Sequence, residues 1–385
     1  MGNNVFYIEE RKTSLISGKN VEHLYTLNNF PVHMLCENKD NKYYGLKCDM
    51  IFDIGIDDGF VQLRKVIPPD LLYKDAHSNA VGGVWEGLRK EFSNILKKYI
   101  FADSEILEIG GGTGKLNALC NEAHMDYLNW DIVEIQPCPV DNCTANFIKG
   151  IFPQALPALK KYDILLHTHC LEHMLDLDGV FFDFSKYLKT NGLMIFAIPD
   201  MDTMIQGAVT SVVNFEHSYL LLDSYVVYLL EKYGFRIIDK EKYGDGHSRI
   251  YVTEYTGMKC KSICDNLYKA NKLLMENFIK RHVKQVKKWN ECPVDGELFL
   301  FGAHITAQFL VAFGLNSSRI EAILDNDCSK IGKYVCGIDV PVKSPKILKG
   351  KKNPIVIIPK SPYATEIMLG IKENINSDTI FWVME

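Results

Sequence analysis

The sequence of 385 residues lacks the features of membrane, secreted and nucleic-acid-binding proteins. No apolar run approaches the ~18 residues that a membrane-spanning helix requires. The net charge is −5, so the positive excess typical of nucleic-acid binders is absent. The first residues contain neither a basic start nor an apolar signal core. We therefore expect a cytoplasmic protein that binds neither membranes nor nucleic acid.

Cysteine is plentiful, but its pattern excludes a disulfide framework. The 11 cysteines are odd in number, and no two are spaced as C-x-x-C. A reducing compartment is the simplest interpretation of this spacing.

The length predicts two or three domains, and the balance of 47% hydrophobic and 24% charged residues is that of a globular protein. We divide the chain into four parts. These are an N-terminal substrate-capping module at residues 1–84, a cofactor-binding domain at 85–260, a connecting helix at 261–292 and a C-terminal domain at 293–385.

Strand-like and helix-like patterns alternate through the second part. An amphipathic helix pattern begins at Val84, and apolar runs then predict strands at residues 106–109, 127–135, 163–167, 193–198, 234–239 and 249–253. This alternation predicts a doubly wound α/β fold with a Rossmann-like sheet. Five further short strands, between residues 297 and 384, predict a smaller α/β domain at the end of the chain.

A glycine-rich turn follows the first strand of the cofactor-binding domain. Residues 106–115 read ILEIGGGTGK. Glycines allow a sharp turn and a close approach to a ligand. Neither the dinucleotide fingerprint nor the phosphate-binding loop fits, because Lys115 and Ile109 stand where these motifs need glycine. The pattern that fits is E-x-G-x-G-x-G, with Glu108 at the strand end and glycines at Gly110, Gly111, Gly112 and Gly114.

Glu134 ends the next predicted strand, 20 residues after Gly114. A ribose-binding carboxylate is expected at this spacing in a nucleotide-binding βαβ unit. Asp131 on the same strand is a rival for this role, and a solvated strand-end acid is the alternative without a ligand.

Two histidine-containing segments follow later strands. His169, Glu172 and His173 would share one face of a starting helix, with the H-x-x-E-H spacing of one zinc protease class. Because the segment follows a parallel strand, we instead expect His169 to face cofactor and substrate, with Glu172 and His173 at the helix start. The pair Glu216-His217 suits a general base, since imidazole titrates near neutrality beside an orienting carboxylate.

These segments resemble the motifs of class I S-adenosylmethionine-dependent methyltransferases. Further segments are similar to the bacterial sugar C-methyltransferases of deoxysugar biosynthesis, and the resemblance covers nearly the whole chain. They are NFEHSY at 214–219, GDGHSR at 244–249, GAH at 302–304, LDND at 324–327 and KIGKYVCGIDVPVKSP at 330–345.

The resemblance implies the cofactor and several site residues. S-adenosylmethionine would be held by Glu108, the four glycines, Glu134 and His169. Catalytic roles would belong to His169, Glu216, His217 and Tyr73, with His77 as the alternative to Tyr73 for closing the pocket. Substrate would be bound by His77, Asn214 and His247.

Two departures from the family pattern affect the expected reaction. Only Cys36 and Cys48 remain of the family's zinc-binding cysteine pairs, and Asn214 replaces a tyrosine that would stabilise an enolate. We therefore expect O-methylation of a nucleotide-linked sugar, of the GDP-heptose type, in bacterial capsule or other surface-polysaccharide synthesis. A divalent metal at the histidines and carboxylates is a further expectation, without assigned ligands.

The alternatives are C-methylation of a nucleotide-linked 4-keto-deoxysugar and a cofactor-binding protein without activity. A nicotinamide-dependent reductase is disfavoured by Lys115. The sequence leaves the oligomeric state open.

Overall fold

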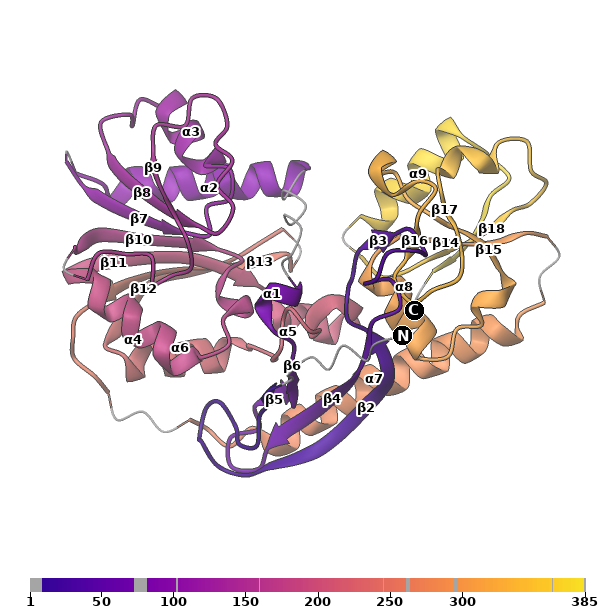
Figure 1. Cartoon of the computed structure of the whole chain (residues 1–385), viewed down its shortest axis with the longest axis horizontal. Coiled ribbons are helices and arrows are strands. Elements are labelled where there is room, and N and C mark those ends of the chain that lie inside the picture. Colours follow the sequence, from indigo (N-terminus) through magenta and orange to yellow (C-terminus); the bar gives the residue numbers. More distant parts are fainter. Residues whose placement is uncertain are drawn as a thin grey trace.

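The structure is a computed structural model that describes residues 9–72, 82–101, 103–158, 160–244, 246–260, 264–293, 296–361 and 363–383. Figure 1 shows two lobes, one built on a seven-stranded sheet and one on a five-stranded sheet, with an N-terminal ribbon and a long helix running beneath them. None of the described helices has the length and apolar character needed to cross a membrane.

The larger lobe contains the predicted doubly wound sheet. Its strands are β7 (Glu105–Ile109), β8 (Asn129–Glu134), β9 (Asn146–Lys149), β10 (Tyr162–Thr168), β11 (Leu188–Pro199), β12 (Phe235–Tyr243) and β13 (Ser248–Tyr255). They lie in the order β12-β13-β11-β10-β7-β8-β9. The five strands from β11 to β9 run parallel, and β13 lies antiparallel between β11 and β12. The expected α/β fold class is confirmed. Strand β9 was not predicted, because its four residues are half-buried or exposed and carry no long apolar run.

Helices cover both faces of this sheet (Figure 1). They are α2 (Gly83–Tyr99) and α3 (Lys115–Glu122) on one face, and α4 (Leu177–Tyr187), α5 (Met201–Gln206) and α6 (Asp223–Lys232) on the other. Alternate strand residues enter the two cores, since side chains along a strand point to opposite faces. Ile106 thus packs with Phe92 of α2, whereas Leu107 belongs to the core that contains Phe184 of α4.

The smaller lobe is a second parallel sheet, in the order β17-β15-β14-β18-β19. Its elements are β14 (Leu298–Phe301), α8 (Ile305–Ala312), η3 (Ser317–Arg319), β15 (Ile320–Leu324), η4 (Cys328–Lys330), β16 (Tyr334–Val335), β17 (Val342–Lys343), η5 (Pro345–Leu348), β18 (Ile355–Ile358), α9 (Ala364–Asn374) and β19 (Ile380–Val383). Asp325 accepts hydrogen bonds from the Ala303 N–H (2.9 Å) and Lys330 Nζ (3.0 Å). Asp325 therefore joins the turns that follow β14 and β15.

The N-terminal segment forms antiparallel ribbons that reach both lobes. Its elements are β1 (Glu9–Glu10), β2 (Val21–Pro31), β3 (Cys36–Glu37), β4 (Lys47–Gly55), β5 (Val61–Leu63), β6 (Lys65–Val66) and α1 (Pro69–Leu72). Strand β3 pairs with β16 of the smaller lobe. The segment 218–220 of the larger lobe pairs with β5 of this ribbon, so the ribbon is joined to the larger lobe as well.

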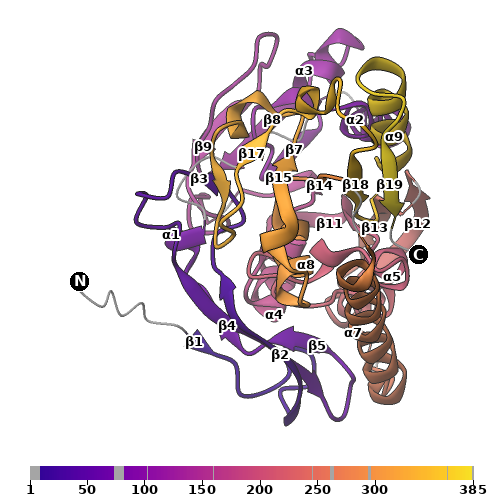
Figure 2. The ribbon, with the colours of Figure 1, turned by 90° about the vertical axis from the view of Figure 1, so that its right-hand side faces the viewer.

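Helix α7 (Tyr268–Glu291) connects the lobes, and Figure 2 shows it below the smaller sheet, opposite the β2–β4 ribbon. The sequence predicted a helix from residue 262. The described residues 264–267 are not helical, so the helix begins later than expected. Asn271 holds the first turns of α7 against the rest of the protein. Its amide donates to Gly59 O (3.0 Å) and to the Tyr225 hydroxyl (2.8 Å).

Candidate functional site

The strand order of the larger sheet reverses between β7 and β10. Strands after β7 continue outward on one side as β8 and β9, whereas β10 and β11 lie on the other side. In open α/β sheets, ligands bind outside the carboxyl ends of the strands at such a reversal. The glycine turn after β7, Glu134 at the end of β8 and His169 after β10 all lie at this edge.

The glycine turn adopts a path that side chains would obstruct. Gly110, Gly112 and Gly114 have φ values of 68°, 58° and 74°, in the left-handed region that favours glycine. A Cβ on Gly111 would lie 2.8 Å from the carboxyl carbon of Glu108, and one on Gly114 would lie 2.4 Å from Cys143 Sγ. The backbone therefore passes directly over Glu108, as a cofactor-binding turn requires.

Glu134 is joined to the same turn. Its carboxylate accepts hydrogen bonds from the Gly112 N–H (2.8 Å) and from the N–H of Ile135 (2.8 Å). This places an anionic group at the end of β8, beside the glycines. Asp131, the rival from the sequence, instead binds Lys160, Tyr162 and Asn146 away from this turn.

Glu108 is a buried carboxylate beneath the turn, with only 4% of its surface exposed. Burial raises the pKa of Glu108 to about 7, and a hydrogen bond from Trp130 Nε1 (3.0 Å) opposes that rise. The Glu108 carboxyl therefore ionises near neutral pH. An ionised Glu108 would attract a cationic cofactor.

The segment after β10 differs from the sequence prediction. His169 has a φ of 49°, so it lies in the left-handed region and not at the start of a helix. A short 3-10 turn, η1 (Leu171–His173), follows, and helix α4 begins only at Leu177, with Asp176 as its cap. The expectation that Glu172 and His173 hold the helix start was wrong, because they belong to this separate turn.

His169 belongs to a cluster with residues from two other elements. Its Nε2 lies 2.7 Å from the Ser248 hydroxyl, which also lies 2.7 Å from Nδ1 of His247. The Trp85 ring, from α2, packs edge-on against both imidazoles. Burial, and then the neighbouring His169, lowers the pKa of His247 to about 4, so this imidazole stays neutral. Sequence reasoning missed Trp85 and Ser248, because nothing in their local pattern differs from ordinary core residues.

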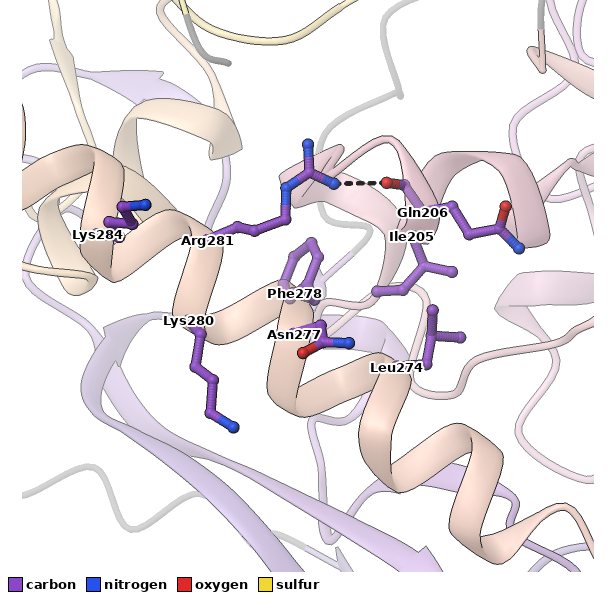
Figure 3. A pocket seen from close by; sticks show the side chains of 8 residues that line it. All are labelled: Ile205, Gln206, Leu274, Asn277, Phe278, Lys280, Arg281 and Lys284. Carbon is purple, nitrogen blue, oxygen red and sulfur yellow. Dashed lines mark hydrogen bonds between the residues drawn. The ribbon is translucent and has the colours of Figure 1, made fainter.

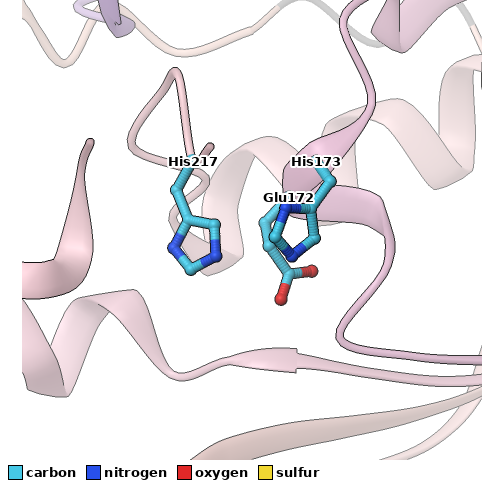
Figure 4. Close-up of side chains that lie close together, drawn as sticks. All are labelled: Glu172, His173 and His217. Atoms are coloured by element: carbon cyan, nitrogen blue, oxygen red, sulfur yellow. The ribbon is translucent and has the colours of Figure 1, made fainter. Parts of the chain in front are cut away.

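A second cluster joins η1 to the loop that carries His217. Glu172, His173 and His217 each offer one ligand atom, and these atoms lie within 4.8 Å of one another. The two imidazole rings are 4.7 Å apart in an edge-on arrangement. Figure 4 shows the His217 ring facing Glu172 and His173 across the same space. The carboxylate grouped here with His217 is thus Glu172, to which the sequence analysis gave a different role.

Three features fix the loop that carries His217. The Asn214 side chain accepts hydrogen bonds from the N–H groups of Glu216 (2.8 Å) and His217 (3.0 Å) and donates to Ser211 O (3.0 Å). After the loop, Leu63 of β5 donates its N–H to Ser218 O (2.8 Å), and Arg11 binds the same residue. The N-terminal ribbon therefore helps to position His217, while Asn214 shapes the loop.

Glu216 is the remaining described residue with a predicted catalytic role. Burial raises the pKa of its carboxyl to about 7. Tyr73 and His77, the predicted pocket-closing residues, lie outside the described residues. Cys36 and Cys48 are buried free thiols, and the one metal-ligand group found among the described residues contains no cysteine.

Two family models match the chain. Residues 84–240 match the model of a methyltransferase domain, and residues 284–384 match that of a C-methyltransferase C-terminal domain. The chain carries a methyltransferase domain. The expected enzyme class, a methyltransferase, is thereby confirmed.

Solved methyltransferase structures are similar to part of this chain. The mitomycin 7-O-methyltransferase has 20% identity and a TM-score of 0.35, and the match covers 43% of this chain and 53% of that one. A Listeria monocytogenes S-adenosylmethionine-dependent methyltransferase has 13% identity and a TM-score of 0.34, and the match covers 42% of this chain and 96% of that one. The magnesium protoporphyrin IX methyltransferase of Synechocystis was solved with bound S-adenosylhomocysteine. It has 15% identity and a TM-score of 0.36, and the match covers 47% of this chain and 90% of that one. The chain thus spans about half the length of the mitomycin 7-O-methyltransferase. No curated protein sequence matches it.

Proposed function

We propose that this methyltransferase transfers the methyl group of S-adenosylmethionine to a hydroxyl of a nucleotide-linked sugar. The acceptor is of the GDP-heptose type, and the reaction is a cytoplasmic step of bacterial capsule or other surface-polysaccharide synthesis. The observation that carries the proposal is the meeting of two features at one sheet edge. These are the Glu108–glycine–Glu134 turn for the cofactor and the Glu172–His173–His217 cluster for the acceptor.

The cofactor half of the proposal rests on charge and shape. Glu134 offers acceptor oxygens for ribose hydroxyls at the end of β8, and the glycine turn leaves room for the cofactor backbone. Glu108 lies beneath the turn, where an ionised carboxylate would favour the positive charge of the cofactor's amino-acid end.

A basic hollow between α5 and α7 supports an anionic acceptor. Its volume is about 500 Å³, and Figure 3 shows Phe278 and Ile205 in its apolar wall. Lys280, Arg281 and Lys284 of α7 also line it, and Arg281 reaches α5 through a hydrogen bond to Gln206 O (2.7 Å). Cationic side chains on an apolar wall suit a nucleoside diphosphate, because phosphates need positive partners and the base needs an apolar surface.

The reaction requires in-line approach of the acceptor oxygen to the methyl carbon. The oxygen–carbon bond forms as the carbon–sulfur bond breaks, its electron pair stays on sulfur, and the hydroxyl proton leaves. The products are S-adenosylhomocysteine, the methyl ether and one proton. Positioning contributes most of the acceleration, and proton removal at His217, with Glu216 as its neighbour in the loop, contributes about 10²- to 10⁴-fold.

Carbon methylation is the second candidate, and the match of residues 284–384 to a C-methyltransferase C-terminal domain favours it. That reaction needs an enolate and a group that stabilises it. The side chain of Asn214 makes three hydrogen bonds within its own loop, so it is not available as that group. Because Asn214 is held by these hydrogen bonds, the structure supports oxygen as the methyl acceptor.

One experiment tests the proposal. The full-length protein is incubated with S-adenosylmethionine and a panel of GDP-, dTDP- and UDP-linked sugars, and the products are weighed by mass spectrometry. We expect a mass gain of one methylene on a sugar without a keto group. A gain only on 4-keto sugars would favour carbon methylation. Cofactor binding by calorimetry without release of S-adenosylhomocysteine would instead indicate a protein without activity.

A further inference from the structure

Glu172 carries a buried carboxylate with an unusual lack of partners. None of its surface is exposed, and neither of its oxygens accepts a hydrogen bond from the part of the chain that the structure describes. Nδ1 of His169 lies 3.4 Å from one of these oxygens. Buried carboxylates are normally paired with a cation or several hydrogen-bond donors, because removing the charge from water is costly. We therefore expect the Glu172 carboxylate to bind a cation.

The other two side chains of this cluster are imidazoles, which offer nitrogen ligands. His173 and His217 each place one ring nitrogen within 4.8 Å of a Glu172 oxygen and of each other. Ligand atoms bound to one metal ion at ~2.0–2.2 Å lie at most ~4.4 Å apart. Three ligands that surround one ion lie closer together, ~3.0–3.8 Å apart, so a closure of about 1 Å brings all three atoms onto one ion. Figure 4 shows the three side chains facing this shared space.

His169 lies beside this cluster and contacts Glu172 from outside it. Its Nδ1 faces Glu172, while its Nε2 contacts the Ser248 hydroxyl at 2.7 Å. Carboxylates that bind metal ions are usually held by outer partners of this kind, which fix their orientation. The left-handed backbone of His169 turns the side chain back toward η1, and strained conformations of this kind cluster at functional sites.

We propose that Glu172, His173 and His217 bind one divalent transition-metal ion, with His169 orienting the Glu172 carboxylate from outside the ligand set. Imidazole nitrogens with a single carboxylate suit iron, manganese or zinc, whereas magnesium and calcium prefer oxygen ligands. The ion would lower the pKa of an acceptor hydroxyl that reaches it. That role rests on the proposed function. His217 removes the proton when no ion is bound; with the ion bound, His217 is a ligand and the hydroxyl proton passes to water, so His217 is needed for turnover in either case.

The binding test uses the full-length protein without substrate. The protein is stripped with EDTA, exchanged into metal-free buffer and titrated with Mn²⁺, and free Mn²⁺ is followed by electron paramagnetic resonance. We expect one Mn²⁺ per chain, displaced by Zn²⁺. Glu172→Gln should weaken binding by about 100-fold or more, and His169→Asn by about 10-fold, since outer partners contribute ~10- to 100-fold. His124→Asn, at an exposed position, should bind as the wild type does.

A folding measurement separates loss of the site from loss of the structure. Mn²⁺ should raise the Tm of the wild type and of His124→Asn, but not that of Glu172→Gln, because an ion stabilises only a protein that binds it when folded. No stoichiometric binding of Mn²⁺ or Zn²⁺ by the wild type, or equal binding by Glu172→Gln, would overturn the proposal.

The same preparations distinguish this proposal from the proposed function. Stoichiometric binding without methylation of any nucleotide-linked sugar would leave the metal site standing and remove the sugar substrate. Methylation at an unchanged rate by the stripped enzyme, with no ion bound, would retain the sugar substrate and remove the metal site.

Discussion

Replacing Glu108 with glutamine should make the stability of the protein depend less on pH. Burial raises the pKa of this carboxyl from its ordinary 4.5 to about 7. A raised pKa means that the folded state holds its proton while the unfolded state has released it. Stability is therefore full below pH 4.5 and falls as the pH rises toward 7.

The size of the effect follows from the two pKa values. Their difference of about 2.5 pH units corresponds to ~3 kcal/mol, at ~1.4 kcal/mol for each unit. Glutamine keeps the shape of the side chain and an oxygen that can accept from Trp130 Nε1, but it has no proton to lose. Glu108→Gln should therefore be more stable than the wild type by about 3 kcal/mol at pH 8 and nearly equal to it at pH 4.5.

Equilibrium urea unfolding at several pH values between 4.5 and 8 measures this difference. Glu216, whose pKa is also raised to about 7, contributes equally to both proteins, so the comparison isolates Glu108. Glu122→Gln, at the exposed end of α3, is the matched control and should show no such dependence. A Glu108→Gln effect of the same size at every pH would refute the reasoning.

The remaining predictions concern binding and turnover. His217→Asn should lower kcat by about 10²- to 10⁴-fold while calorimetry finds the affinity for S-adenosylmethionine unchanged; wild-type kcat would remove His217 from the site. Glu134→Gln should weaken cofactor binding by ~10-fold, because charge-assisted hydrogen bonds are lost, and kcat at saturating cofactor should change little. Lys284→Ala should raise KM for the nucleotide-linked sugar several-fold at low salt and less at high salt, because exposed charges are screened. An unchanged KM would place the diphosphate elsewhere.

The cofactor side of the site could be predicted because its residues are close together in sequence. The glycine turn, Glu108 and Glu134 lie on two consecutive strands, and a parallel sheet brings the ends of such strands to one edge. Spacing alone was therefore enough to place them. The structure adds the contact between Glu134 and the Gly112 N–H, which depends on side-chain position.

The acceptor side could not be predicted to the same degree. Helical spacing placed His169 beside Glu172, and the two side chains do lie 3.4 Å apart, but the left-handed backbone keeps His169 out of the helical turn that holds Glu172 and His173. The meeting of His173 with His217 depends on the N-terminal ribbon, which holds the loop after His217 through backbone hydrogen bonds from β5. Such long-range pairing leaves no local pattern in the sequence.

Whether oxygen or carbon accepts the methyl group depends on the residues around the methyl group and not on the C-terminal lobe. Residues 284–384 match a C-methyltransferase C-terminal domain, and this match describes the architecture of that lobe. The candidate site instead consists of side chains from η1, from the His217 loop and from β13. A carbon acceptor needs an enolate stabiliser there, and an ion bound by Glu172, His173 and His217 would stabilise an enolate as well as an alkoxide. A metal-binding result therefore does not choose between the two acceptors, whereas a methyl ether on a sugar that has no keto group does, since no enolate can form on that sugar.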